Sequence, residues 1–198
     1  MISDTFAEAV REALDEALCD PTVYILGQLA RFGTAGMTSG LHERHPGKVL
    51  TYPVCEALMT ASAMGMSLAG MRPVCVHERF DFTMLAMDAL VNHIPVWARR
   101  QRLPLVMLVV VGKGGGQGPQ HSKDFTRWFE SLEGWRVFVP QSPAESTSMM
   151  KTAIFCEGPA MFVTHREHMK KTEAFEVDTP SKIVLCGASK RHEAERYA

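Results

Sequence analysis

The chain has 198 residues, enough for one domain of ordinary size, or for one domain and the start of another. Apolar residues make up 46% of the sequence and charged residues 22%, a composition that excludes a disordered chain. The 21 Lys and Arg residues nearly balance the 22 Asp and Glu residues, which excludes binding to nucleic acid or to a membrane surface through bulk positive charge.

Short apolar segments alternate with helical patterns along the first half of the chain. Apolar residues at three- and four-residue spacing predict helices at residues 6–19, 37–45, 56–68 and 83–100. Apolar runs bounded by Gly, Pro or Asp predict short buried strands at residues 23–26, 49–51 and 74–76. Pro95 lies inside the last helix, and we expect it to kink or break that helix, because proline has no backbone N–H.

The second half contains the strongest predicted strand, residues 105–111, an unbroken apolar run typical of a central parallel strand buried on both faces. Further helices are predicted at residues 124–132 and 144–156, and further strands at residues 137–139, 161–163 and 182–187. This alternation predicts an α/β protein with three α/β/α layers and a mainly parallel sheet. Ligands of such sheets bind at the carboxyl ends of the strands.

The five cysteines are odd in number, widely spaced and without a CxxC pair, which excludes a disulfide scaffold and a zinc ribbon. We therefore expect reduced thiols and a cytoplasmic protein. The first four residues lead directly into an amphipathic pattern, so no signal peptide is predicted. The longest apolar run, residues 103–111, is too short to span a bilayer.

A Gly-rich loop, GKGGGQGPQHS at residues 112–122, follows the central strand, where a ligand is expected. It is not a nucleotide P-loop, because Lys113 stands near its start and is followed by Gly114 rather than by Ser or Thr. A flexible loop without a ligand is the alternative. His121 ends the loop, and it either moves a proton near neutral pH or simply bonds to backbone at a helix start.

Two further positions lie beside predicted strands. Glu56 begins a helix among apolar neighbours. Its carboxylate either only benefits from the helix dipole, or it holds a proton that is used in chemistry. Phe80 and Phe82 bracket Asp81, and we expect both rings in the core, with stacking on a ligand as the alternative.

Two histidine pairs have the i,i+3 spacing of metal ligands: His42 with His45, and His165 with His168. Neither pair has a third ligand nearby in the sequence. We therefore expect solvated surface histidines and predict no metal site.

Six segments together resemble one family over nearly the whole chain. They are REALDEAL from Arg11, VYILGQ from Val23, YPVCEALMTASAMGMSLAGMRPV from Tyr52, RFDFTMLAMDALVNH from Arg79, GKGGGQGPQHS from Gly112 and GPAMFVTHRE from Gly158. These segments resemble the transketolase-like pyrimidine-binding domain of the beta subunit of thiamine-diphosphate-dependent 2-oxoacid dehydrogenases. The resemblance implies the fold of that domain for residues 1–172. Residues 173–198 would be a linker and the first strand of a C-terminal transketolase domain that this chain lacks.

The resemblance also implies roles for five residues. Glu56 stands where the family has the glutamate that bonds the pyrimidine ring nitrogen and activates the cofactor. Phe82 matches the aromatic residue that packs on the pyrimidine ring, and Gln28 and Val54 match positions that line the same pocket. His121 matches the histidine that faces the substrate or the incoming lipoyl group.

The chain departs from the family pattern at three points. Gln28 replaces a residue that is often acidic. Cys156 and Gly158 stand where many relatives place Asp and Asn around a structural potassium ion. The sequence contains no Gly-Asp-Gly, the motif that holds the diphosphate and Mg²⁺ in this family. The resemblance therefore implies that thiamine diphosphate and Mg²⁺ are held mainly by an alpha-type partner subunit.

The implied function is that of a subunit in a heteromeric enzyme. With its partner it would decarboxylate a small 2-oxo acid and transfer the acyl group, for example to a lipoyl domain. Self-association of the chain is left open. Two alternatives also remain: a subunit of a carboligase or transketolase-like synthase, and a non-catalytic assembly or regulatory domain derived from this family.

Overall fold

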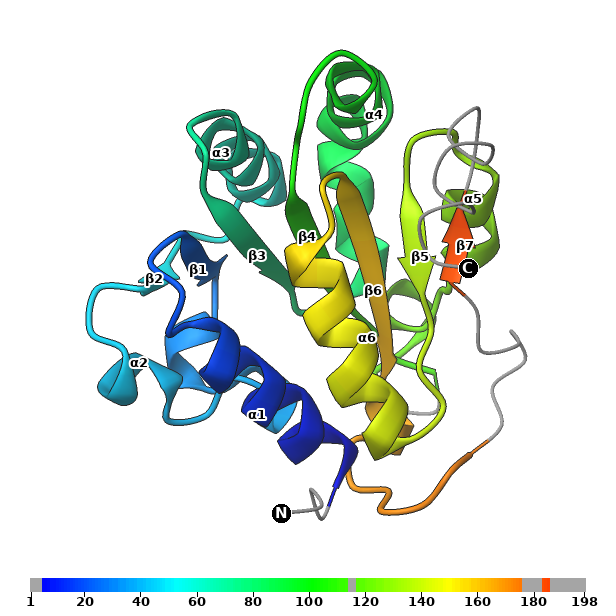
Figure 1. Cartoon of the computed structure of the whole chain (residues 1–198). Helices are drawn as coiled ribbons and strands as arrows, with labels where there is room; N and C mark the ends of the chain where they lie inside the picture. Colours follow the sequence, from blue (N-terminus) through cyan, green and yellow to red (C-terminus); the bar gives the residue numbers. More distant parts are fainter. Residues whose placement is uncertain (1–4, 114–116, 176–182, 186–198) are drawn as a thin grey trace, which may run out of the picture.

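One sheet of seven strands lies at the centre of the computed structural model, which describes residues 5–113, 117–175 and 183–185 (Figure 1). Its spatial order is β2-β1-β3-β4-β6-β5-β7. The strands are β1 (Val23–Gly27), β2 (Val49–Thr51), β3 (Arg72–His77), β4 (Leu105–Val111), β5 (Arg136–Phe138), β6 (Pro159–His165) and β7 (Ile183–Leu185). Strands β1 to β6 pair in parallel, and β7 pairs antiparallel with β5.

Helices cover both faces of this sheet, so the predicted three-layer α/β/α class is confirmed (Figure 1). One face is covered by α1 (Phe6–Ala17) and α6 (Pro143–Phe155), with the short α2 (Leu41–Arg44) at the β2 edge. The other face is covered by α3 (Glu56–Leu68), α4 (Ile94–Ala98) and α5 (Thr126–Ser131).

The central strand β4 joins the two halves of the hydrophobic core. All seven of its residues are buried. Its even-numbered side chains pack among those of α1 and α6, and its odd-numbered side chains pack among those of α3, α4 and α5. Because successive side chains of a strand point to opposite faces, an unbroken apolar run is required here, as the sequence predicted.

The predicted helix at residues 83–100 is not a regular helix. It is a 3-10 helix (Phe80–Ala86), a π-helical segment (Asp88–His93) and then α4, with Pro95 in the first turn of α4. In a π-helix each N–H donates to the carbonyl five residues earlier, as the Ile94 N–H does to the Ala89 carbonyl. The next donor in this register, to the Leu90 carbonyl, would be residue 95, but Pro95 has no N–H. Instead Trp135 Nε1 donates to the Leu90 carbonyl at 2.9 Å. A distant side chain thus satisfies the carbonyl that the proline leaves unpaired.

The C-terminal predictions fall partly outside the described residues. The predicted linker at 173–181 is described only to residue 175, and the predicted strand at 182–187 only as β7. The division of the chain at residue 172 stays a prediction.

A double-mutant cycle tests the role of Trp135. Trp135→Phe should lower the free energy of unfolding by about 1–3 kcal/mol, because the buried Leu90 carbonyl loses its donor. In a Pro95→Ala background the restored N–H can pair with that carbonyl, so the same substitution should cost about 1 kcal/mol less. Urea denaturation of the four proteins measures both costs. Equal costs in the two backgrounds would show that Pro95 and Trp135 are not coupled.

Candidate active site

A pocket of about 480 Å³ opens beside the carboxyl ends of β1, β3 and β4. Ten residues line it: Gln28, Leu29, Val54, Glu56, Glu78, Arg79, Phe82, Leu85, Gln117 and His121. All five residues that sequence comparison singled out are in this set, namely Gln28, Val54, Glu56, Phe82 and His121. The structure therefore brings the five together, while their roles stay predictions.

The topology of the sheet explains this convergence. Gln28 directly follows β1, Glu56 is the first residue of α3, and Phe82 lies in the 3-10 helix that follows β3. Carboxyl ends of parallel strands meet at one edge, so segments that are far apart in sequence meet there.

Glu56 is a buried carboxyl group that lines the pocket. It is only 4% exposed, and within the described residues no hydrogen bond or ion pair engages its carboxylate. Its position at the first turn of α3 favours a negative charge through the helix dipole. Because the carboxylate lines the pocket and has no partner among the described residues, it is free to form a hydrogen bond with a ligand there.

Phe82 and His121 are neighbours at the pocket. Their ring centroids lie 5.2 Å apart with planes at 82°, an edge-to-face arrangement. Phe80 is fully buried, whereas Phe82 is half-buried and lines the pocket. The prediction that both rings belong to the core is right for Phe80 and wrong for Phe82, because the 3-10 helix points the two rings in different directions.

The Gly-rich loop is held close to β3. A Cβ atom at Gly112 would overlap the backbone carbonyl oxygen of His121, so only glycine fits there. Arg79 reaches the loop and donates from Nη2 to Gln117 Oε1. These contacts fix both ends of the loop, although residues 114–116 lie outside the described part of the chain.

A second polar cluster lies beyond the loop, around Asp124. Burial opposes ionisation of this carboxyl group, but hydrogen bonds from His165 and Thr126 hold its pKa well below the usual range. Lys113 Nζ lies 3.8 Å and His165 Nε2 3.6 Å from Asp124 Oδ2. The cluster thus ties the two ends of the Gly-rich loop to β6.

Two of the four histidines expected at the surface are not there. His165 ends β6 and is buried, and His168 is buried against the Phe175 ring at 3.9 Å between centroids. His42 and His45 are half-buried, and His45 Nε2 lies 2.7 Å from Asp15. Within the described residues, no group of three or more His, Cys, Asp or Glu side chains is placed to hold a metal ion.

His77 is buried at the end of β3. Its Nε2 lies 3.2 Å from Thr60 Oγ1, one helical turn from Glu56 in α3, and its Nδ1 is buried without a partner. Burial lowers the pKa of His77 to about 4.

Comparison with known proteins identifies the family. The sequence pattern of the family described as "Transketolase, pyrimidine binding domain" matches residues 3–171. The chain belongs to this family. The family resemblance found in the sequence is therefore confirmed.

Relatives of this pyrimidine-binding domain include beta subunits of the pyruvate dehydrogenase E1 component. The protein from Caenorhabditis elegans is 30% identical over 167 residues, which cover 80% of this chain and 47% of that protein. The one from Chaetomium thermophilum is 34% identical over 164 residues, covering 77% and 43%. The one from Saccharomyces cerevisiae is 30% identical over 187 residues, covering 88% and 50%. The chain thus spans about half the length of these relatives.

Solved structures share the fold of this domain. A split-gene transketolase, described as an inactive beta4 tetramer, superposes with a TM-score of 0.68 at 22% identity, covering 90% of this chain and 55% of that one. Transketolase from Campylobacter jejuni superposes with a TM-score of 0.70 at 18% identity, covering 86% and 26%.

The expected cytoplasmic location is contradicted by the relatives. The three named above are described as mitochondrial proteins. Reduced thiols indicate a reducing compartment, but they do not distinguish the cytoplasm from other reducing compartments. Cys19, Cys55, Cys75 and Cys156 are free thiols. Among the described residues, no helix is long and apolar enough to cross a membrane.

The sequence analysis assigned no role to half of the residues that line the pocket: Leu29, Glu78, Arg79, Leu85 and Gln117. A signal for two of them was present. Glu78 and Arg79 directly follow β3, at the edge where ligands of parallel sheets bind.

The buried His77 predicts a pH-dependent stability. The folded protein takes up a proton at about pH 4, whereas the unfolded histidine does so near its usual value of 6.5. In that window the unfolded state binds more protons, so the free energy of unfolding should fall as the pH drops from 6.5 to about 4. The loss attributable to His77 reaches about 3 kcal/mol.

A His77→Phe variant serves as the comparison. Phenylalanine does not titrate, and its loss of the Thr60 contact is a pH-independent offset. Urea denaturation between pH 4 and 7 should therefore give a shallower pH dependence for the variant. Parallel curves for the two proteins would contradict the prediction.

Proposed function

We propose that the chain is the pyrimidine-domain subunit of a heteromeric thiamine-diphosphate-dependent 2-oxoacid dehydrogenase, in which Glu56 activates the cofactor. One observation carries the proposal: Glu56, Phe82 and His121 line a single pocket in a domain of the transketolase pyrimidine-binding family. Relatives that are beta subunits of the pyruvate dehydrogenase E1 component support this reading. The proposed donor is a small 2-oxo acid, and the proposed acceptor is a lipoyl group.

The residues fit the pyrimidine half of the cofactor. The pocket volume of about 480 Å³ is that of a small-molecule site. Phe82 offers a ring face to a flat heterocycle, with Gln28 and Val54 on the same walls. The Glu56 carboxyl group has free capacity to hold a proton at a ring nitrogen. When bound, thiamine diphosphate supplies the electron sink that a 2-oxo acid needs for decarboxylation.

His121 is suited to proton transfer at the substrate. It lines the same pocket as Glu56, and its ring is oriented by the edge contact with Phe82. Its Nδ1 is buried without a hydrogen-bond partner. An imidazole so placed can donate a proton to a developing oxyanion, or take a proton from a hydroxyl group when the reaction runs onward.

The pocket is incomplete on one side, which supports a partner subunit. Val54 is 78% exposed and Leu85 67% exposed, and both line the pocket. Apolar side chains exposed at the mouth of a site are typical of an interface. Since the sequence has no Gly-Asp-Gly, we propose that an alpha-type subunit covers this rim and holds the diphosphate and Mg²⁺.

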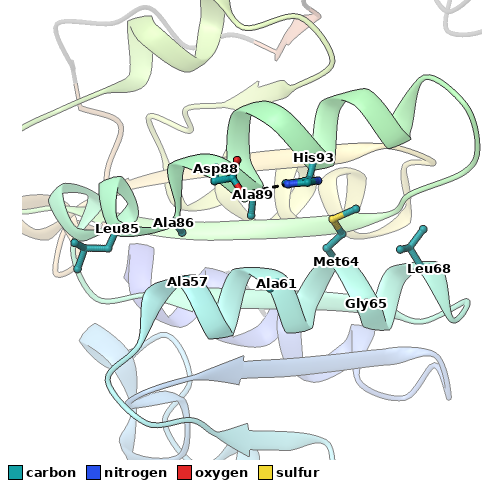
Figure 2. Close-up of a pocket in the computed structure, with 10 residues that line it drawn as sticks. All are labelled: Ala57, Ala61, Met64, Gly65, Leu68, Leu85, Ala86, Asp88, Ala89 and His93. Atoms are coloured by element: carbon teal, nitrogen blue, oxygen red, sulfur yellow. Dashed lines mark hydrogen bonds and ion pairs between the residues drawn. The ribbon is translucent and has the colours of Figure 1, made fainter.

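A second pocket extends this surface along α3 (Figure 2). It has a volume of about 410 Å³ and lies between α3 and residues 85–93. Figure 2 shows Ala57, Ala61 and Gly65 along the α3 wall, and Leu85 belongs to both pockets. The exposed apolar surface is therefore continuous from the site to α3. We propose that the same partner subunit seats on it, with a second copy of this chain as the alternative occupant.

Co-purification tests the proposed partner. The tagged chain should return from its native host with a stoichiometric second chain that carries Gly-Asp-Gly. The pair should decarboxylate a 2-oxo acid in a reaction that requires thiamine diphosphate and Mg²⁺. Recovery of this chain alone, without binding of thiamine diphosphate, would overturn the proposal and favour a non-catalytic domain.

Glu56→Gln separates a catalytic role from a structural one. In the purified pair, this variant should lose at least about 100-fold in kcat, because the amide cannot supply the proton. Assembly, measured by size-exclusion chromatography, should be unchanged, since glutamine keeps the shape of the side chain. Ser148→Ala, on the exposed face of α6, is the matched control and should keep full activity. Turnover by Glu56→Gln within twofold of the native pair would contradict the assignment.

Gly65→Ala tests whether α3 is covered by the partner. A Cβ at Gly65 meets no atom within 4 Å, so the isolated chain should gain about 0.5–1 kcal/mol in unfolding free energy from better helix propensity. Against a closely packed partner the added methyl group would clash, and the Kd of the pair should rise at least about tenfold. Calorimetric titration measures this change. An unchanged Kd would place the partner elsewhere.

A further inference from the structure

Arg79 is a buried cation in the pocket that the proposed chemistry does not use. Its side chain lines the pocket, yet the residue is only 7% exposed. Nη1 donates to the Glu78 carbonyl oxygen at 2.6 Å, and Nη2 donates to the Gln117 side chain. Nε is buried without a partner. Both partners are neutral groups, and the guanidinium keeps unused donors.

No carboxylate within the described residues lies at ion-pair distance from Arg79. Burial lowers the pKa of Arg79, Arg166 lowers it further, and the more distant carboxylates of Glu78 and Asp81 oppose this only in part. A buried guanidinium that has an unused Nε–H, and that carboxylates attract only from beyond ion-pair distance, is incompletely compensated by the fold. An anion in the pocket would compensate it.

Other unpaired polar atoms gather at the same place. Glu78 Oε1, Asp81 Oδ2 and His121 Nδ1 are each buried without a hydrogen-bond partner. Glu78 and His121 line the pocket together with Arg79. Gly112 packs between Cδ of Arg79 and the backbone carbonyl of His121, so the Arg79 side chain passes close to the end of the loop that carries His121. Carboxylate oxygens only accept hydrogen bonds, so an anion in the pocket would satisfy the buried Arg79 Nε–H but not the oxygens of Glu78 and Asp81.

The anion that Arg79 binds is not the carboxylate that leaves. Decarboxylation removes that charge, so an ion pair with it would be stronger in the ground state than in the transition state and would slow the reaction. An ion pair with a second anionic group persists through the reaction, and therefore contributes to binding without raising the barrier.

We propose, on the basis of the proposed function, that Arg79 selects donor substrates with a second anionic group, a carboxylate or a phosphate, distal to the reacting carbonyl. The planar guanidinium fork matches both groups.

The test uses the assembled pair of this chain and its co-purified partner, with a dye as electron acceptor. The donors are pyruvate, 2-oxobutyrate, 2-oxoglutarate and its phosphonate analogue 2-oxo-4-phosphonobutyrate. A donor with a second anion should have a kcat/KM at least about tenfold higher than pyruvate. The donor that shows this preference identifies the group as carboxylate or phosphate. In the Arg79→Gln pair, kcat/KM for that donor should fall about 100-fold, at least about tenfold more than it falls for pyruvate and 2-oxobutyrate.

Two variants keep the test decisive. Arg79→Lys keeps the positive charge but not the planar guanidinium, which can bind an anion through two parallel hydrogen bonds. Its kcat/KM should fall about tenfold for the donor with the second anion only. This variant tests the proposal even if the Arg79→Gln pair fails to assemble. Arg99→Gln removes an exposed arginine that pairs with Glu133, and should leave all four donors unchanged.

Other outcomes overturn the inference. An equal loss on all donors in the Arg79 variants, matched by Gln117→Ala, would mean that Arg79 only positions the Gly-rich loop. Wild-type preference for pyruvate would also overturn it, while leaving the proposed function intact. Absence of turnover on every donor by the native pair would overturn the proposed function, and this inference with it.

Discussion

The burial of β4 on both faces is the constraint on which the rest of the molecule depends. Its seven side chains hold the two helical layers together, and its backbone is paired along its length with β6 and in part with β3. This pairing is parallel, so the carboxyl ends of β1, β3 and β4 face one edge. All residues of β4 are apolar and buried, and the chain becomes polar and exposed only after the strand ends, where Gly112 begins the Gly-rich loop. The position of the pocket therefore follows from the parallel pairing of these strands.

Two buried charged residues at that edge, Glu56 and Arg79, are the basis of the proposed binding roles. Glu56 and Arg79 are both more than nine-tenths buried, and neither has an ion-pair partner among the described residues. A buried charge without a direct ion pair disfavours folding unless hydrogen bonds, solvent in the pocket or a ligand compensate it. By contrast, the buried Asp124 carboxylate is paired with His165 and Thr126, as expected for a structural charge. Asp124 is thus fully paired within the fold, whereas Glu56 and the Nε of Arg79 are not, which is why ligand roles are proposed for the latter two.

Local patterns predicted the fold well, because burial is periodic in sequence. The strand at 49–51 and the helix at 56–68 were predicted with their observed bounds. The segment from residue 83 was not, since its shape depends on Trp135, which is distant in sequence. Family motifs contained five pocket residues, and the position directly after β3 indicated Arg79. The burial of His165 and of the Arg79 side chain depends on contacts between elements, which no local pattern contains.

The proposed division of the site between two chains follows from the same geometry. The buried groups, Glu56 and Arg79, lie on this chain and are fixed by its sheet, whereas the exposed Val54 and Leu85 leave the mouth of the pocket to be closed from outside. A partner that holds the diphosphate can position the cofactor, whereas the pocket residues around the reacting end of the cofactor come from this chain. If the two proposals hold, cofactor anchoring and donor choice are therefore separate properties, the first carried by the partner and the second largely by Arg79 on this chain.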